Sequence, residues 1–383
     1  MIIDNNYLVQ RIETLIKEKQ QSSRIEQKEN NRLYQIKLRF PQWLRNIIFH
    51  PFNPVYSVYL QNKIYKKNDK RKYIGLSPVH PQAVDFIRYC FTHDFRLDTS
   101  VYYPESDGAT LMRVVDNRIK SVLGGYEKIA LDKDQQNYYK QSLDLKAKVR
   151  KEGNKYRLNV EGVDYCLPEN NFPGQTYIHD YGLRYLPEYV KEYIEGKDFL
   201  DFGAYIGDAS IFFAKKYNPK HLYAYEPIED TAKRLAEAVK INNIECITVV
   251  QKGIGNTIED INIFIDTLAS SSCSINNSMV SSEGNTQKIS VSTIDNDCKN
   301  MKVGLIKMDI EGAEYAAIEG GLEIIKRDKP VLLISMYHTG KDFFEIPPML
   351  KNAVADYNFR FLDLEVHFPL CEKILVAYPA RHT

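Results

Sequence analysis

Apolar runs and helix-like segments alternate along the second half of the chain. Five short apolar runs are bounded by turn-forming residues and are predicted as strands over residues 199–202, 221–225, 246–251, 303–308 and 330–337. Such alternation predicts a parallel sheet whose two faces are covered by helices. Two further runs, 359–366 and 372–378, lie too close together for a helical crossover and must pair antiparallel. The pattern therefore predicts an α/β, doubly wound, Rossmann-like sheet with a terminal antiparallel hairpin.

The first 152 residues have a different pattern and are predicted to form a mostly helical accessory region. Residues 4–29 carry apolar positions at helical spacing and predict one amphipathic helix, a candidate seam for a homodimer. Further helices are predicted over 81–92, 110–123 and 134–151, followed by a hairpin of 156–160 with 163–167. We place the domain boundary near Gly153, which gives an accessory domain of 1–152 and a second domain of 153–383.

A second hairpin is predicted inside the alternating half. Residues 261–265 and 287–291 read as strands, and they flank a loop rich in serine and asparagine over residues 269–282. Loops of this composition usually lie at the surface and often contact ligands. We expect an inserted hairpin with a mobile tip.

Charge and cysteine content narrow the class of protein. The formal net charge of the chain is +1, so no global field favours nucleic acid or another polyanion. Lys and Arg are concentrated among aromatic residues in residues 36–72, a segment that could contact a membrane surface, an acidic partner or nucleic acid. The six cysteines form no C-x-x-C pair, and no segment is long and apolar enough to span a membrane. We expect a cytoplasmic protein.

The most specific local pattern surrounds the first predicted strand of the sheet. Phe199 to Asp208 reads F-L-D-F-G-A-Y-I-G-D, and the following residues 209–217 read as a helix. Gly203 and Gly207 remove side chains where a ligand approaches the backbone, and the free amides of a helix start favour an anionic group. The turn is predicted to cradle a ligand.

The next strand carries an acid that identifies the kind of ligand. Residues 221–225 end in Glu226-Pro227, and an acid at this place in a doubly wound sheet binds the two hydroxyls of a ribose. The glycines do not follow the G-x-G-x-x-G spacing of a dinucleotide site. An adenosyl ligand with an amino-acid tail fits better, with Asp201 holding the ammonium group. That ligand is S-adenosylmethionine.

Taken in order along the chain, the motifs resemble the FkbM family of S-adenosylmethionine-dependent methyltransferases over residues 168–378. The motifs are the glycine turn, Y-E-P at 225–227, K-G-I-G-N at 252–256, S-T-I-D at 292–295, I-K-M-D-I-E-G-A-E at 306–314 and S-M-Y-H at 335–338. The resemblance implies a class I methyltransferase fold and methyl transfer to a hydroxyl, often on a sugar or glycan or on a secondary metabolite. The expected cofactor contacts are Asp201, Gly203, Ala204, Tyr205, Gly207, Asp208, Glu226, Pro227, Lys252, Gly253 and Asp309.

Four polar residues fall at the carboxyl ends of different predicted strands, where open parallel sheets bind ligands. They are Asp201, Glu226, Asp309 and His338. We expect His338 to act as general base near neutral pH, with Asp309, Glu311 and Lys307 as its catalytic partners. Glu314 is expected either to contribute to the site or only to occupy a first helical turn, where acids are favoured. We expect no metal, and leave open the alternative that Asp309, Glu311 and His338 hold a divalent ion.

Two other functions remain open at this stage. A nucleic-acid methyltransferase could dock through the basic residues 36–72, although D-I-E-G stands where such enzymes carry an N-P-P-Y type motif. A scaffold protein could bind S-adenosylmethionine without turnover. A small-molecule or glycan acceptor is the expected partner, and nucleic acid is not.

Overall fold

The structure, a computed structural model, describes residues 1–18, 72–76, 80–123, 127–265, 273–274 and 285–381. These residues form two compact units. The first comprises Met1–Asp98, Met112–Lys140 and Val366–Leu370, and the second comprises Thr99–Leu111, Gln141–Glu365 and Cys371–Thr383. Among the described residues, no helix combines the length and the apolar character needed to cross a bilayer.

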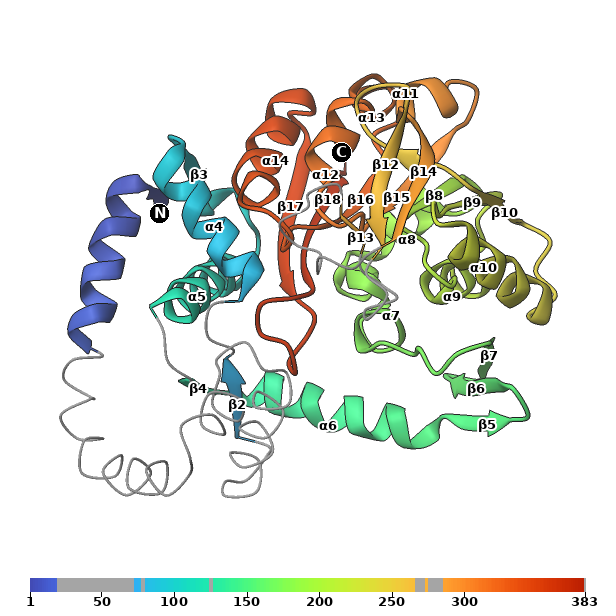
Figure 1. Cartoon of the computed structure of the whole chain (residues 1–383), viewed down its shortest axis with the longest axis horizontal. Helices are drawn as coiled ribbons and strands as arrows, with labels where there is room; N and C mark the ends of the chain where they lie inside the picture. Colours follow the sequence, from blue (N-terminus) through green and yellow to red (C-terminus); the bar gives the residue numbers. More distant parts are fainter. Residues whose placement is uncertain (19–71, 77–79, 124–126, 266–272, 275–284, 382–383) are drawn as a thin grey trace. The chain divides into compact units, whose positions relative to one another are not determined.

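A seven-stranded sheet forms the centre of the second unit (Figure 1). Its strand order is β10-β9-β8-β15-β16-β18-β17, and every pair is parallel except the two made by β18. The strand bounds are β8 Asp198–Phe202, β9 His221–Tyr225, β10 Ile247–Val250, β15 Val303–Met308, β16 Val331–Ser335, β17 Tyr357–Asp363 and β18 Lys373–Pro379. The predicted doubly wound sheet and its terminal antiparallel hairpin are confirmed.

The chain reverses its direction of winding between two neighbouring strands. From β8 it proceeds outward to β9 and β10, whereas from β15 it proceeds the other way to β16. Ligands bind at such a switch point, beyond the carboxyl ends of the strands. The turn after β8 and the motif after β15 therefore lie at the place where a ligand is expected.

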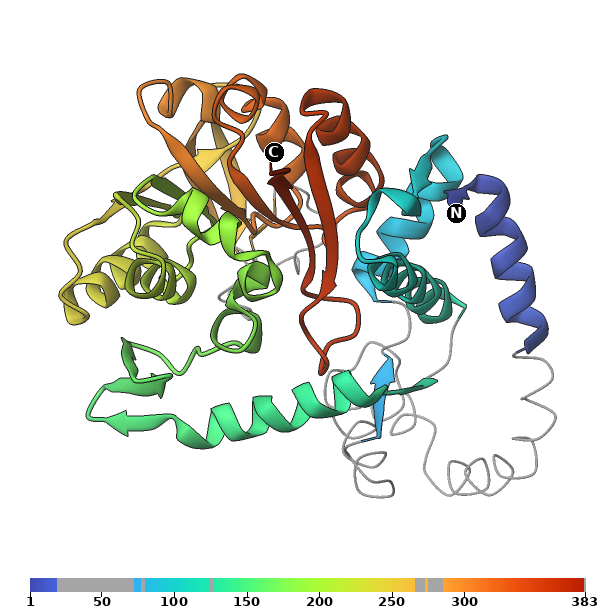
Figure 2. The ribbon, with the colours of Figure 1, turned by 180° about the vertical axis from the view of Figure 1, so that it is seen from behind.

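Helices cover the sheet on both faces (Figures 1 and 2). Side chains of alternate strand residues pack on one face with α8, α9 and α10, where Phe199, Leu222, Leu305 and Val376 belong to one continuous core. The helix bounds in this unit are α7 Gly174–Tyr177, α8 Glu188–Ile194, α9 Asp208–Lys216, α10 Glu229–Ile241, α11 Ile294–Asp297, α12 Glu314–Glu319, α13 Leu322–Asp328 and α14 Gly340–Ala353, with a 3₁₀ segment η2 Asp180–Tyr185.

Two smaller sheets belong to the same unit. The hairpin of β6 Lys155–Val160 with β7 Val163–Leu167 is confirmed, and β5 Arg150–Glu152 extends it. The inserted hairpin is part of a four-stranded sheet in the order β11-β14-β12-β13. Its strands are β11 Gly253–Ile254, β12 Glu259–Ile265, β13 Cys273–Ser274 and β14 Asn285–Ser292. Most of the loop predicted to have a mobile tip lies outside the described residues.

The first unit is mainly helical. Residues 5–18 are helical, and the rest of the amphipathic helix predicted over residues 4–29 lies outside the described residues. The other elements carrying its fold are β1 Ile2–Asp4, β2 Tyr73–Leu76, α4 Pro81–Thr92, β3 Arg96–Asp98, β4 Glu127–Ala130, and parts of α5 Glu105–Val122 and α6 Lys133–Lys148, two helices that are divided between the units. Two short antiparallel pairs, β1 with β3 and β2 with β4, complete it. The basic segment 36–72 falls outside the described residues except for its last position.

The segment Thr99–Leu111 belongs to the second unit although it precedes the boundary predicted near Gly153. Its 3₁₀ turn, η1 Thr99–Val101, leads to a bridge between Tyr102 and Phe359 of β17. Asp107 then accepts hydrogen bonds from Arg360 Nε at 2.5 Å and from the Phe361 amide at 3.1 Å. A fragment of residues 153–383 would lack these contacts, because Tyr102 and Asp107 precede it.

Replacing Asp107 with alanine should lower the free energy of unfolding of the full chain by about 2–3 kcal/mol. The substitution removes the acceptor of a largely buried guanidinium and of a buried amide. Urea denaturation measures the effect, and the matched control is Glu105→Ala, which replaces an exposed acid in the same first turn of α5. Equal stability of the two variants would contradict the structural role of Asp107.

Candidate active site

A cavity of about 420 Å³ opens at the carboxyl edge of the large sheet, over the switch point between β8 and β15. Many of the residues expected from the sequence line it. They are Gly203, Tyr205, Asp208, Glu226, Pro227, Lys252, Gly253, Lys307, Asp309 and Glu311. Four other expected residues, Asp201, Ala204, Gly207 and His338, do not line the cavity.

Two glycines shape the turn between β8 and α9. Gly203 has a φ of 74°, and a Cβ atom there would lie 1.9 Å from the Asp309 carbonyl oxygen. Gly207, with a φ of 88°, would place a Cβ atom 2.5 Å from Leu235. Only glycine therefore fits either position. The close approach at Gly203 brings the ends of β8 and β15 together at the cavity.

Glu226 follows β9 and lines the cavity. Its side-chain oxygens accept hydrogen bonds from the amides of Tyr205 and Ile228, each at 3.0 Å, so the carboxyl group is held in one position. Burial raises the pKa of Glu226 to about 7, although the two amide hydrogen bonds act in the opposite direction. A fixed buried carboxyl with oxygen lone pairs toward a cavity can accept hydrogen bonds from a pair of vicinal hydroxyls.

Asp201 and Lys307 form a buried ion pair across the switch point. The strand register sets Asp201 of β8 beside Lys307 of β15, and their charged atoms lie 3.0 Å apart. Asp201 also accepts a hydrogen bond from Ser210 at 2.5 Å, and Lys307 donates one to the Gly203 carbonyl oxygen at 2.7 Å. Burial opposes the charge on Lys307, but Asp201 and Asp309 outweigh it and raise the pKa of the ammonium group.

These contacts change the roles expected from the sequence. Asp201 was expected to hold the ammonium group of the ligand, yet its carboxylate is engaged by Lys307 and Ser210 away from the cavity wall. Lys307 was expected to be a catalytic partner of His338, and its Nζ atom instead connects the turn after β8 to β15. We interpret both as positioning residues of the glycine turn.

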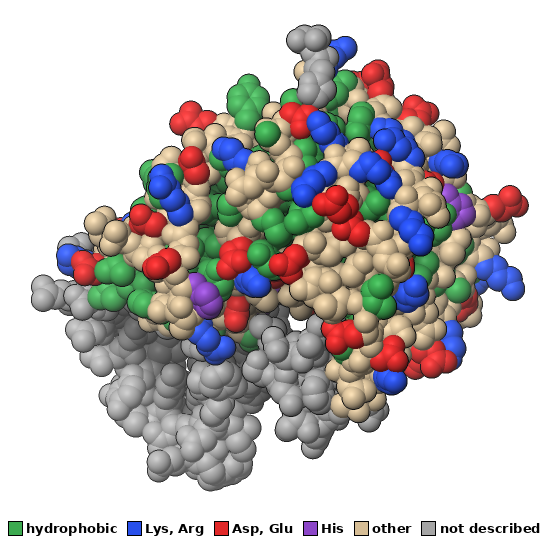
Figure 3. Space-filling model, turned by 90° about the horizontal axis from the view of Figure 1, so that it is seen from above, with side chains coloured by type: hydrophobic (Ala, Val, Ile, Leu, Met, Phe, Trp, Pro, Cys, Tyr) green, Lys and Arg blue, Asp and Glu red, His purple; other side chains and the backbone are tan. Residues whose placement is uncertain are grey.

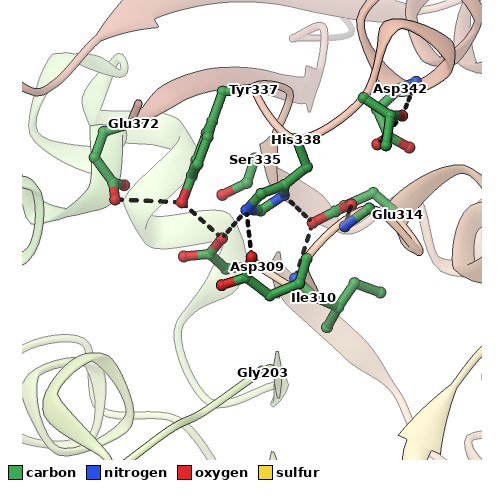
Figure 4. Close-up of polar contacts among 12 residues, drawn as sticks. Gly203, Asp309, Ile310, Glu314, Ser335, Tyr337, His338, Asp342 and Glu372 are labelled. Atoms are coloured by element: carbon green, nitrogen blue, oxygen red, sulfur yellow. Dashed lines mark hydrogen bonds and ion pairs between the residues drawn. The ribbon is translucent and has the colours of Figure 1, made fainter. Parts of the chain in front are cut away.

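Asp309 directly follows β15 and reaches the cavity between two tyrosines. Tyr181 donates a hydrogen bond to its Oδ2 atom at 3.0 Å, and Tyr337 donates one to its Oδ1 atom at 3.2 Å. The Tyr337 hydroxyl also lies 3.3 Å from Glu372, whose pKa is raised to about 8 by burial and by the charge of Asp309 (Figure 4). The two tyrosines thus fix the orientation of the Asp309 carboxylate, and Asp309 also lines the cavity.

His338 lies behind the acids that face the cavity (Figure 4). Its Nδ1 atom is 2.9 Å from Glu314, and its Nε2 atom is 3.6 Å from carboxylate oxygens of Asp309 and Glu311. Burial opposes a charge on the ring, but Glu314 and the two other acids outweigh burial and raise the pKa of His338 to about 10. A histidine that already holds its proton at neutral pH is a poor general base, so this arrangement does not support the role expected from the sequence.

Glu314 and Glu311 have distinct positions in the D-I-E-G turn. Glu314 is fully buried and accepts hydrogen bonds from the amides of Ile310 and Gly312 at 2.8 and 2.9 Å, which fixes the turn. Glu311 has a left-handed backbone, with a φ of 56°, and extends its side chain to the cavity wall. Burial raises the pKa of Glu311 to about 7.

Sequence reasoning missed several residues of the cavity wall, chiefly Tyr181, Tyr337, Glu372 and Asn171. Tyr337 stands in the S-M-Y-H motif, which was a usable signal. Tyr181 lies in η2 with a φ of 54°, a backbone conformation that no helical or strand pattern indicates.

Asp208, at the start of α9, also lines the cavity. It accepts hydrogen bonds from Asn171 and Thr176 at 3.3 Å, and burial raises its pKa to about 7.

The strand order, the glycine turn and the acid after the second strand define a class I methyltransferase fold. The family model described as the methyltransferase FkbM domain matches residues 201–361, which extend from the end of β8 into β17 and include most of the cavity wall. The chain therefore contains an FkbM methyltransferase domain, as its motifs indicated.

Solved structures with a similar fold include other methyltransferases. The methyltransferase FkbM from Methylobacillus flagellatus is 19% identical, with a TM-score of 0.38 over 64% of this chain and 60% of that one. An rRNA methylase from Streptococcus thermophilus is 11% identical, with a TM-score of 0.34 over 56% of this chain and 99% of that one. The tRNA (uracil-54, C5)-methyltransferase of Pyrococcus abyssi, solved with S-adenosyl-L-homocysteine, is 17% identical, with a TM-score of 0.32 over 59% of this chain and 44% of that one. None of the curated proteins matches the chain in sequence.

Proposed function

We propose that this protein is an S-adenosylmethionine-dependent O-methyltransferase that acts on a hydroxyl of a sugar, a glycan or a secondary metabolite. One observation carries the proposal. A single cavity is lined by the fixed carboxyl of Glu226, which follows β9, and by the carboxylates of Asp309 and Glu311, which follow β15 on the other side of β8. The first suits the ribose of the cofactor, and the second pair suits a hydroxyl that must lose a proton.

The residues around the glycine turn fit the cofactor. Gly203 leaves no room for a Cβ atom, and Tyr205 presents its backbone at the cavity while its amide orients Glu226. Glu226 would accept hydrogen bonds from the ribose hydroxyls. S-adenosylmethionine supplies an electrophilic methyl group on a positively charged sulfur.

The acids after β15 would prepare the acceptor. A hydroxyl bound between Asp309 and Glu311 can donate its hydrogen bond to one carboxylate, which takes the proton as the new carbon–oxygen bond forms. The carbon–sulfur bond breaks and its electron pair stays on sulfur. Tyr181 and Tyr337 hold Asp309 in one orientation, which reduces the loss of entropy when the acceptor is aligned.

Methyl transfer by the full chain tests the proposal. The protein is incubated with S-adenosylmethionine labelled in its methyl group and with separate panels of sugars, glycans, phenolic metabolites and RNA, and products are identified by mass spectrometry. The proposal predicts label on a hydroxyl oxygen, with the rate lowered at least a hundredfold in Asp309→Asn. Label on a nucleobase, or cofactor binding without transfer to any panel, would contradict it.

The nucleic-acid alternative receives no support from the face of the molecule that Figure 3 shows. On the face seen in Figure 3, Lys and Arg side chains are interspersed with Asp and Glu. A phosphate backbone is bound by an extended basic surface. The basic residues 36–72 lie almost wholly outside the described part of the chain, and the RNA panel of the assay examines their contribution directly.

A further inference from the structure

The group formed by Asp309, Glu311 and His338, named here the acid–histidine cluster, has the composition of a metal centre. Three carboxylates, those of Asp309, Glu311 and Glu314, surround one imidazole. Lys307, the ammonium on the same strand, is committed to Asp201 and to a carbonyl oxygen. Negative groups that are partly removed from water are compensated by positive charge, which the proton on His338 supplies unless a bound cation takes its place.

The orientation of His338 points to where such a cation would lie. Its ring is 4% exposed, and its Nδ1 atom lies 2.9 Å from Glu314, an acceptor when that group is ionised. Nδ1 then carries one hydrogen, and a bound cation would displace the second proton of the ring, which is on Nε2. Among the described residues, Nε2 has no hydrogen-bond partner and faces the carboxylates of Asp309 and Glu311. A carboxylate that orients a histidine through Nδ1 while Nε2 binds an ion is a common feature of metal sites.

The distances from Nε2 fit an ion held between the ring and a carboxylate. Asp309 Oδ1 and Glu311 Oε2 each lie 3.6 Å from Nε2. Two ligand atoms bound about 2.1 Å from one ion are separated by about 3.6 Å when they subtend an angle of about 120°. Asp309, His338 and Glu314 place ligand atoms within 4.8 Å of one another, a set that does not include Glu311, but both oxygens of Glu314 already accept amide hydrogen bonds. Glu314 is therefore the orienting group, and Glu311 would supply the third ligand by turning its partly exposed side chain toward Asp309.

We propose that the acid–histidine cluster binds a divalent cation through Asp309, Glu311 and His338, in contrast to the sequence-based expectation of no metal. Asp309 and Glu311 line the cavity, so the remaining coordination positions face it. Building on the proposed function, an acceptor hydroxyl bound there would be polarised by the ion, and its proton would pass more easily to the Glu311 carboxylate oxygen that is not bound to the ion. Oxygen and nitrogen ligands of this kind suit Mg²⁺, Mn²⁺ or Zn²⁺.

Direct binding of Mn²⁺ to the full chain tests the site without any assay of activity. Electron paramagnetic resonance measures free Mn²⁺ during titration, and competition with Mg²⁺ and Zn²⁺ ranks the ions. We expect one saturable site, weakened at least tenfold in Asp309→Asn, Glu311→Gln and His338→Ala. Glu192→Gln, an exposed acid on α8, serves as the matched control and should bind as the parent does.

Each outcome decides the proposal. Glu311 lies in a turn and is partly exposed, so Glu311→Gln remains informative even if the substitution of buried His338 prevents folding. Absence of a saturable site in the parent, or equal affinity of the parent and Glu311→Gln, would overturn the metal site. Binding of S-adenosyl-L-homocysteine is measured on the same preparations, so loss of the cofactor proposal and loss of the metal proposal are separate results.

Discussion

Replacing Lys307 with methionine is expected to lower the free energy of unfolding by about 3–5 kcal/mol. Methionine has a similar length and fills the same space, but it leaves the Asp201 carboxylate, which is 1% exposed, without its cation. The Gly203 carbonyl oxygen also loses a donor at 2.7 Å. Urea denaturation of the full chain, followed by circular dichroism, measures the loss.

The double variant Asp201→Asn with Lys307→Met separates the ion pair from packing. Removing both charges leaves no buried ion, so the double variant should recover much of the stability that the single variant loses. The Asn side chain can still accept the hydrogen bond from Ser210. Losses that simply add in the double variant would show that the two residues do not interact in the folded chain.

Replacing Glu226 with glutamine is expected to weaken binding of S-adenosyl-L-homocysteine at least tenfold. A hydrogen bond to a charged acceptor contributes about 1.5–3 kcal/mol, and a tenfold change corresponds to about 1.4 kcal/mol. The amide keeps the size of the side chain and can still accept from Tyr205 or Ile228. Isothermal titration measures the affinity, with Glu237→Gln on the exposed side of α10 as the control.

The same residue predicts how the affinity depends on pH. The pKa of Glu226 is raised to about 7, and donation by ribose hydroxyls would stabilise its charged form. The ligand therefore binds the deprotonated state better, and its affinity should rise between about pH 6 and pH 8 and then level off. Glu226→Gln should remove this rise. A parent profile that is flat or falls over this interval would exclude Glu226 as the group that titrates.

The sheet could be predicted because each of its strands has a local signature. Buried parallel strands are continuous apolar runs, and all seven predicted runs overlap the observed strands. Contacts between strands were harder to predict. The pairing of Asp201 with Lys307 depends on β8 lying beside β15, a register that joins residues 106 positions apart and has no local signature. The sequence put Lys307 and Asp309 on one face of their strand, but it could not show which neighbour Lys307 would meet.

Glu372 illustrates a second limit. We searched for site residues at the carboxyl ends of strands, which is the right rule for parallel strands. Because β18 is antiparallel, its beginning lies at that edge, and the residue just before it reaches the cavity. The contacts of His338 could not be predicted either. Its three acids come from a turn and from the start of a helix, and the sequence does not specify the backbone conformation there. The type of site could be predicted from the sequence, but the roles of its individual residues could not.

The inserted four-stranded sheet contributes a wall of the cavity that is apolar. Ile261 and Ile263 of β12 and Ile289 and Val291 of β14 line it, whereas Glu226, Asp309 and Glu311 follow strands of the large sheet. Under the proposed function, the acids that prepare the acceptor hydroxyl and the apolar wall that would contact the bound molecule come from separate stretches of the chain. A lineage could exchange the insertion and acquire a new acceptor while the ancestral chemistry stayed intact, which is a route to diversification that requires few simultaneous changes.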